Sequence, residues 1–178
     1  MPVFLNEHPK SGRIMYETRQ NREAEAAGLQ RLADAMGCSV KQTDSLERWD
    51  GTLYHGDRVA ALAEYKEKGK VYGGLGTDGY NGGNLYLDLS KWVTLTNFEL
   101  SQQLPAYYMV ELKLGDYLVR IGELMPMDLR IEMKGRKDRP GATNDICPTV
   151  RIPFRFFTPL TGYFCRATEE NKREEWAF

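Results

Sequence analysis

The sequence contains few of the residues that build zinc sites or disulfide frameworks. Its 178 residues include only three cysteines, Cys38, Cys147 and Cys165, and two histidines, His8 and His55. The cysteines are odd in number and widely spaced, and no Cys-x-x-Cys pair is present, which argues against a zinc site and a disulfide scaffold. A cysteine–histidine nucleophilic pair stays open without a local motif to support it. We expect the cysteines to be buried free thiols.

Long apolar segments are also missing. The longest strongly apolar stretches, such as Ala106–Val110, are far shorter than the ~20 residues that cross a bilayer. The N-terminal sequence turns polar after five residues, which is not the pattern of a secretory signal peptide. We therefore expect a cytoplasmic protein without a membrane partner.

The chain has no excess of either charge, since 24 lysines and arginines balance 25 aspartates and glutamates for a net charge of −1. A strongly basic chain would indicate a nucleic-acid ligand directly, and this chain does not. The charge is uneven, however, because residues 129–155 carry seven basic and three acidic side chains, a local net charge of +4. This stretch is either a solvated loop and strand face or a surface that follows a DNA backbone through Lys134, Arg136, Lys137 and Arg139.

The length and the order of elements predict one domain of mixed α/β (α+β) fold. Hydrophobic residues make up 42% of the chain and charged residues 28%, as in ordinary soluble domains. We expect a single domain over residues 1–178, with a C-terminal extension from about residue 123. A glycine-rich stretch, residues 73–83, is predicted to be a loop, and it lacks the Gly-Lys-Ser/Thr of a phosphate-binding loop. The predicted helices are 17–36 and 90–103, and the predicted strands are 39–42, 49–54, 58–66, 106–113, 117–122, 127–133 and 150–157.

The first predicted helix carries a carboxylate on its apolar side. At about 100° per residue, Glu25 falls on the same stripe as Leu29 and Leu32. The side chain lies either at the edge of the stripe in water, or against a polar site under the helix.

A predicted hairpin brings two further carboxylates together. Alternate residues of a strand share a face, so Glu64 and Lys66 project to the same side. If His55 opposes Arg58, Asp50 lies one place from Glu64, and a three-residue turn puts the two directly opposite each other. In both registers the carboxylates lie on neighbouring strands within about 5 Å at Cβ.

Two carboxylates at this separation repel each other unless a positive charge lies between them. A divalent cation such as Mg²⁺ meets this need, because it binds one or two carboxylates together with waters and phosphate oxygens. The backbone carbonyl of Tyr65 could add a ligand, and the ammonium of Lys66 could orient a water or stabilise a phosphorane-like transition state. The alternative is that Glu64 and Lys66 form an exposed charge pair, although the preceding apolar run of residues 59–63 favours a strand covered on both faces.

This arrangement resembles the PD-(D/E)XK nuclease superfamily. The resemblance rests on Asp50-Gly51, a spacer, and Glu64-Tyr65-Lys66 at the end of an apolar strand, and it extends over residues 17–122. The preceding helix with Glu25 is similar to the first acidic position of the family. Trp49 stands where the family often has proline.

The resemblance implies a restriction-endonuclease-like or junction-resolvase-like core, with a central mixed β-sheet flanked by helices. It also implies roles for individual residues: Asp50, Glu64 and the Tyr65 carbonyl would bind Mg²⁺ or Mn²⁺, Lys66 would position the attacking water, and Glu25 would assist. Lys91 near the start of the second helix would contact a phosphate, or it is a surface lysine. Gln103 and Tyr107 echo a Gln-x-x-x-Tyr element of exonuclease-like members, although Pro105 interrupts the helix that this element needs.

The function expected from these residues is Mg²⁺-dependent endonucleolytic hydrolysis of DNA, with RNA as a possible substrate. Small enzymes of this kind are often phage-encoded and dimeric, so a homodimer is a further expectation. Two alternatives remain. One is a catalytically inactive nuclease-fold module that binds nucleic acid or protein. The other is an unrelated α+β interaction domain, in which Glu25, Asp50 and Glu64 would not converge.

Overall fold

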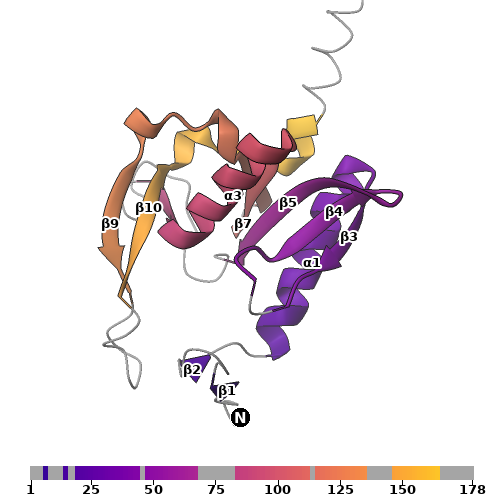
Figure 1. Ribbon diagram of the computed structural model, residues 1–178, viewed down its shortest axis with the longest axis horizontal. Helices are drawn as coiled ribbons and strands as arrows, with labels where there is room; N and C mark the ends of the chain where they lie inside the picture. Colours follow the sequence, from indigo (N-terminus) through magenta and orange to yellow (C-terminus); the bar gives the residue numbers. More distant parts are fainter. Residues whose placement is uncertain are drawn as a thin grey trace, which may run out of the picture.

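A six-stranded mixed sheet forms the centre of the molecule (Figure 1). The computed structural model describes residues 6–7, 14–15, 19–44, 47–67, 83–112, 115–135 and 146–164. The strands are β3 (Ser39–Gln42), β4 (Gly51–His55), β5 (Arg58–Glu67), β7 (Ala106–Leu112), β8 (Gly115–Arg120) and β11 (Thr158–Pro159). Their order is β11-β8-β7-β5-β4-β3. The β5–β7 pair is parallel and the other pairs are antiparallel.

A second, antiparallel sheet has the strand order β6-β10-β9. Its strands are β6 (Asn84–Asp88), β10 (Cys147–Pro153) and β9 (Arg130–Lys134). A further short pair consists of β1 (Asn6–Glu7) and β2 (Ile14–Met15). The predicted fold class, a mixed α/β fold with a central mixed sheet, is confirmed. The sequence analysis predicted no strand over β6 and no second sheet, because β6 and β10 are far apart in the chain and pair only in the folded protein.

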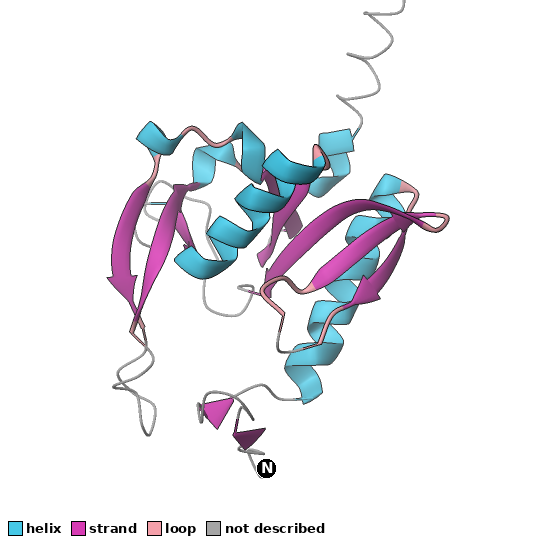
Figure 2. Cartoon of the chain, in the orientation of Figure 1, coloured by secondary structure: helices cyan, strands magenta, loops and turns pink. Residues whose placement is uncertain are grey.

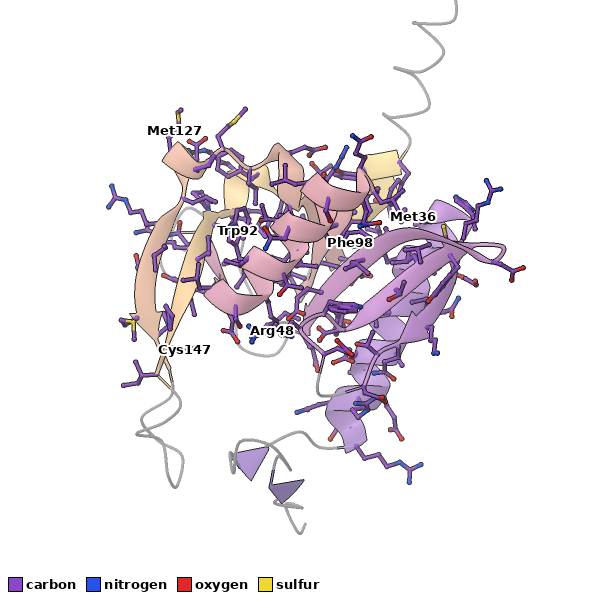
Figure 3. The ribbon with its side chains drawn as sticks, in the orientation of Figure 1. Met36, Arg48, Trp92, Phe98, Met127 and Cys147 are labelled. Atoms are coloured by element: carbon purple, nitrogen blue, oxygen red, sulfur yellow. The ribbon has the colours of Figure 1, made fainter. Side chains whose placement is uncertain are left out.

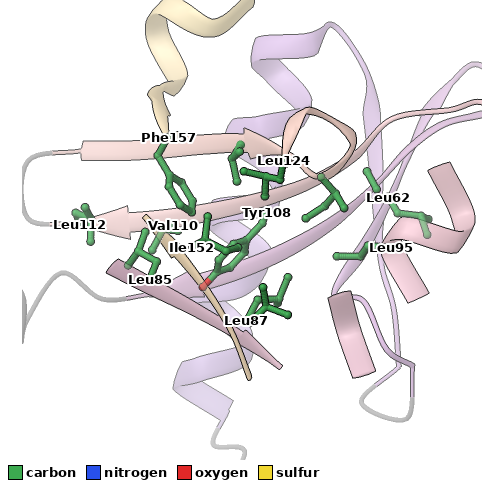
Figure 4. Packing of buried hydrophobic residues seen from close by; sticks show 14 residues of the cluster. Leu62, Leu85, Leu87, Leu95, Tyr108, Val110, Leu112, Leu124, Ile152 and Phe157 are labelled. Carbon is green, nitrogen blue, oxygen red and sulfur yellow. The ribbon is translucent and has the colours of Figure 1, made fainter. Parts of the chain in front are cut away.

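The helices α1 (Arg19–Met36) and α3 (Leu89–Gln102) pack on opposite sides of β5 (Figure 2). Leu29 and Leu32 of α1 pack in one core with alternate β5 residues, including Ala61 and Ala63. Leu62 points to the other side. There it packs in a second core together with residues of α3, β7 and the second sheet. Figure 4 shows this core, which includes Leu95, Tyr108, Val110, Ile152 and Phe157. No described helix has the length and apolar character needed to cross a bilayer.

Most predicted elements match the structure within a few residues, and two predictions near prolines are wrong. Residues 127–133 do not form one strand, since Pro126–Asp128 is a 3₁₀ turn and β9 begins at Arg130. The strand predicted over 150–157 ends at Pro153 and is followed by a 3₁₀ turn, Phe154–Phe156. Proline has no N–H to donate and a fixed φ, so it favours a turn over continued pairing. The glycine-rich loop lies almost wholly outside the described residues.

A bulge in the β4–β5 hairpin sets the register that matters for Asp50. His55 opposes Arg58 and Tyr54 opposes Val59, and the register then shifts so that Leu53 opposes Ala61. Ala60 is therefore the extra residue of a β-bulge. The structure thus combines the two predicted registers. Next to the turn, the pairing of His55 with Arg58 follows the first predicted register. Beyond the bulge, the pairing of Gly51 with Ala63 follows the second predicted register, in which Asp50 and Glu64 are opposite each other.

The C-terminal part of α3 is held by a buried carboxylate. Glu99 accepts hydrogen bonds from the backbone N–H of Ala106 at 3.3 Å and of Gly122 at 2.9 Å, and from Arg120 Nε at 2.5 Å. Ala106 begins β7, so Glu99 ties the end of α3 to the strand that pairs with β5. These bonds fix the direction in which α3 crosses the sheet.

The side chain of Tyr65 fixes the end of β5 against α1. Its hydroxyl donates a hydrogen bond of 2.5 Å to Glu111 Oε2, and Arg31 of α1 also contacts that oxygen. Burial raises the pKa of Glu111, but the hydrogen bonds from Tyr65 and Arg31 outweigh it and the net pKa is lowered. The ring lies so close to Gly28 that a Cβ there would be 2.1 Å from Tyr65 Cε2.

Replacing Gly28 with alanine should lower the free energy of unfolding by about 1–3 kcal/mol, because the new methyl group must displace the hydrogen-bonded Tyr65 ring. Chemical denaturation measures the difference. The matched control is Gly162→Ala, which is also in a helical segment and where a Cβ meets no atom within 4 Å, so it should leave stability unchanged or raise it by up to about 1 kcal/mol. Equal stabilities for the two variants would contradict this packing.

Replacing Glu111 with glutamine should reduce stability at pH 7 by about 1 kcal/mol or less, because solvent partly screens the ion pair. A carboxyl with a lowered pKa in the folded state stabilises the protein above its unfolded pKa of about 4.3, and that stability is lost as the pH falls through the folded value. The difference between wild type and Glu111→Gln should therefore shrink below about pH 4. Urea denaturation of both proteins at pH 7 and below about pH 4 measures this difference. The control is Glu23→Gln, which removes the carboxylate of the exposed Arg19–Glu23 pair.

Candidate active site

Asp50 and Glu64 meet at the ammonium group of Lys91. Lys91 Nζ lies 3.0 Å from Asp50 Oδ1 and 2.5 Å from Glu64 Oε1, and it donates a hydrogen bond to each. Asp50 directly precedes β4, Glu64 lies in β5, and Lys91 is the third residue of α3. The hairpin thus supplies the two carboxylates, and the first turn of the helix supplies the cation.

This cluster is largely removed from water. The Glu64 side chain is 3% exposed, that of Asp50 14% and that of Lys91 26%. Burial raises the pKa of Glu64 well above its usual range, Lys91 opposes this shift and the charge of Asp50 adds to it. Burial lowers the pKa of Lys91, but the two carboxylates outweigh it, so the net pKa is raised and the ammonium form is favoured.

One oxygen of Glu64, the buried Oε2, has no hydrogen-bond partner among the residues that the structure describes. A buried carboxylate oxygen of this kind is costly unless a donor or a cation reaches it. The lysine therefore satisfies only part of the negative charge that the fold places here.

The backbone around Asp50 holds its carboxylate in place. Tyr65 N–H donates a hydrogen bond of 2.9 Å to Asp50 Oδ2, and Asp50 N–H donates one of 3.0 Å to the Ala63 carbonyl. The Asp50 carbonyl accepts a bond of 3.0 Å from Thr43 N–H at the end of β3. Asp50 is thus held from both neighbouring strands although it lies outside β4.

The predicted lysine of the site, Lys66, is half-buried. Strand alternation puts it on the face of Glu64, and its positive charge acts to lower the pKa of that carboxyl. The Tyr65 side chain points to the opposite face, into the core with α1. Only the backbone of Tyr65 is therefore available to the Asp50–Glu64 side.

The predicted convergence of Glu25 with Asp50 and Glu64 is only partly seen. Gln42 Nε2 donates a hydrogen bond of 2.6 Å to Glu25 Oε1, and Gln42 is the last residue of β3. The next residue, Thr43, is the one that donates to the Asp50 carbonyl. Glu25 therefore lies at the same end of the sheet as Asp50, joined to it through β3.

The residues predicted to bind nucleic acid lie in different surroundings. Lys91 forms ion pairs with Asp50 and Glu64, whereas the sequence predicts a lysine that contacts a substrate phosphate or lies on the surface. Lys134 on β9 lies 3.5 Å from Glu132 Oε2 and 4.7 Å from the centre of the Tyr86 ring. Arg136, Lys137 and Arg139 fall outside the described residues.

Arg48 is a basic residue that sequence reasoning did not single out. It is exposed and lies two residues before Asp50, in the segment that approaches the start of α3 (Figure 3). Its position in the sequence relative to Asp50 is the signal that could have found it.

Two other sequence hypotheses gain no support from the structure. Gln103 is exposed at the end of α3, whereas Tyr107 is buried in the core with α1, so they do not form one site. Cys38 Sγ lies 3.5 Å from His55 Nε2, but burial raises the pKa of the thiol, which opposes nucleophilic use. Cys38 and Cys147 are only half-buried, so the prediction of buried thiols is wrong for both, and Cys165 lies outside the described residues.

The donor set of the site suits a hard divalent cation that keeps much of its water. Within the described ranges, no three His, Cys, Asp or Glu side chains gather closely enough to form a complete metal cage. Mg²⁺ commonly binds through one or two carboxylates, with waters and substrate phosphates completing its octahedron. Asp50, Glu64 with its unpartnered oxygen, and a backbone carbonyl fit that requirement.

The chain was compared with curated proteins, solved structures and protein families. No curated protein matches the chain. Among solved structures, the Holliday junction resolvase Hjc of the archaeal hyperthermophile Archaeoglobus fulgidus is similar at 12% sequence identity, with 79% of this chain and 96% of the resolvase covered and a TM-score of 0.42. A family model described as "Phage putative PDDEXK endonuclease" matches residues 11–160. Since that match covers most of the chain, the protein belongs to this PD-(D/E)XK endonuclease family, as the Asp50, Glu64 and Lys66 pattern predicts.

Proposed function

We propose that the protein is a divalent-metal-dependent endonuclease that hydrolyses phosphodiester bonds of DNA. The observation that carries this proposal is the meeting of the Asp50 and Glu64 carboxylates in a largely buried site, with one Glu64 oxygen unpartnered among the described residues. Membership of a nuclease family supports the same chemistry. A purely structural charge pair would not need two buried carboxylates side by side.

Each residue of the site has a role in this proposal. Asp50, Glu64 and the Tyr65 backbone carbonyl hold Mg²⁺ or Mn²⁺. The bound ion supplies Lewis-acid stabilisation of phosphate charge and lowers the pKa of a water. Lys66, on the face of Glu64, orients the attacking water and stabilises negative charge on the phosphate oxygens. Glu25, held by Gln42, assists from the helix side.

A nucleic-acid substrate is proposed because basic residues lie on and directly after β9 and next to Asp50 in the sequence. Lys134, Arg136, Lys137 and Arg139 contact the DNA backbone through salt-dependent phosphate contacts, and exposed Arg48 adds a positive charge beside Asp50. These contacts carry no information that separates DNA from RNA. The preference for DNA therefore rests on the family resemblance.

A catalytically inactive module that binds nucleic acid or protein is the second candidate. It is favoured by Lys91, which already neutralises part of the carboxylate charge. It is opposed by the intact set of Asp50, Glu64 and Lys66, which binding alone does not require.

Four further expectations stay predictions: a single domain over residues 1–178, a homodimer, phage origin and a cytoplasmic location.

Glu64→Gln and Lys66→Met should each lower the rate of DNA cleavage by at least ~10²-fold, because each removes a group that holds the metal or stabilises the transition state. Cleavage of linear, circular, single-stranded and branched DNA is measured with Mg²⁺ or Mn²⁺ and, in parallel, with EDTA. An RNA substrate is tested in the same way. The substrate that is cut fastest indicates the biological role.

The matched control is Glu67→Gln, which removes an exposed carboxylate from the same strand. Circular dichroism and thermal unfolding establish that each variant is folded. If both site variants cut as fast as the wild type, the site is wrongly assigned. If the wild type cuts no nucleic acid with either metal, the inactive binding module is the better account.

A further inference from the structure

Lys91 occupies the place where a cation between the two carboxylates belongs. Its Nζ contacts Asp50 Oδ1 at 3.0 Å and Glu64 Oε1 at 2.5 Å, so one ammonium bridges both side chains. Two carboxylates in a buried site repel strongly, because water does not screen them there. Without a bridging cation, the hairpin would hold two uncompensated charges together.

We propose that the Lys91 ammonium is a built-in counterion of the metal-free protein, and that a divalent ion must displace it to bind Asp50 and Glu64. This inference rests on the proposed function, since it assigns Lys91 a part in loading the same site. Lys91 is thereby a positioning residue that competes with the metal, in place of the permanent phosphate contact that the sequence suggests.

The partial fit of the lysine supports displacement over a permanent pair. Glu64 Oε2 is buried and has no partner among the described groups, so the ammonium leaves one oxygen of the site unsatisfied. An ammonium carries one charge and three donors, whereas a divalent ion carries two charges and accepts up to six oxygen ligands. A divalent ion is therefore the better partner for this pair of carboxylates.

The helix that carries Lys91 allows the side chain to move while the backbone stays in place. Trp92, labelled on α3 in Figure 3, and Leu95 pack in the core between the sheets. Glu99 ties the other end of α3 to β7 and η1 (Ile121–Glu123). The flexible four-carbon stem of lysine can still turn aside from this fixed backbone. Once displaced, the ammonium stays near the site, where it can meet a substrate phosphate.

The test compares wild type with Lys91→Met, which keeps the length of the side chain and removes the charge. In EDTA, Lys91→Met should have a Tm lower by about 6 °C or more, because two buried carboxylates lose their counterion. Mn²⁺ should restore the Tm of the variant and bind it about tenfold or more tightly by calorimetry, because no ammonium competes. The control, Lys41→Met at an exposed position of β3, should match wild type in both measurements.

Binding of Mn²⁺ to Lys91→Met with the wild-type affinity or more weakly, or no Mn²⁺ binding to either protein, would overturn the proposal. If Lys91→Met does not fold, amine modification of the wild type followed by peptide mass spectrometry decides instead. Lys91 should react slowly in EDTA and several-fold faster with saturating Mn²⁺, while Lys41 reacts equally in both. Unchanged reactivity of Lys91 when Mn²⁺ is bound would overturn displacement.

These measurements do not depend on cleavage. A protein that binds Mn²⁺ by displacing Lys91 but cuts no nucleic acid retains the counterion role and loses the proposed activity. A protein that cuts DNA, and in which Lys91→Met binds Mn²⁺ no more tightly, retains the activity and loses the counterion role.

Discussion

The repulsion between the Asp50 and Glu64 carboxylates is the constraint on which the site depends. The fold brings these groups to one ammonium in a place where their side chains are 14% and 3% exposed. Water offsets little of the charge of a buried carboxylate, so hydrogen-bond donors or a cation must do so. Lys91 supplies part of that charge, and Glu64 Oε2, which has no partner within the described part of the chain, marks the part that it leaves. Site chemistry and stability are therefore linked through the same two residues.

The scaffold keeps these carboxylates together from several directions. A bulge at Ala60 brings Asp50 into register with Glu64, and Tyr65 N–H holds the Asp50 carboxylate. The Tyr65 ring is itself fixed on the other face by Gly28 and Glu111. One strand, β5, thus carries polar groups for the site on one face and core residues on the other. A shift of β5 at the site would therefore also change its packing against α1.

Local sequence patterns were sufficient to predict the hairpin, both long helices and the closeness of Asp50 to Glu64, because strand alternation and turn residues act over short distances. These local patterns could not predict the role of Lys91, because that role depends on the direction in which α3 crosses the sheet. This direction is set by tertiary contacts such as those of Glu99. The second sheet was missed for a related reason, since β6 and β10 are distant in the chain. Helical periodicity placed Glu25 on the inner stripe, but its bond to Gln42 depends on how α1 meets β3.

The most direct test of a cation site at Asp50 and Glu64 is a crystal structure of the wild-type protein soaked with Mn²⁺, with anomalous scattering used to locate the ion. We expect an anomalous peak within about 2.0–2.5 Å of oxygens from both carboxylates, as for divalent ions on oxygen ligands, with Lys91 Nζ moved out of contact with them. A map without such a peak, in which Lys91 still bridges Asp50 and Glu64, would contradict this account.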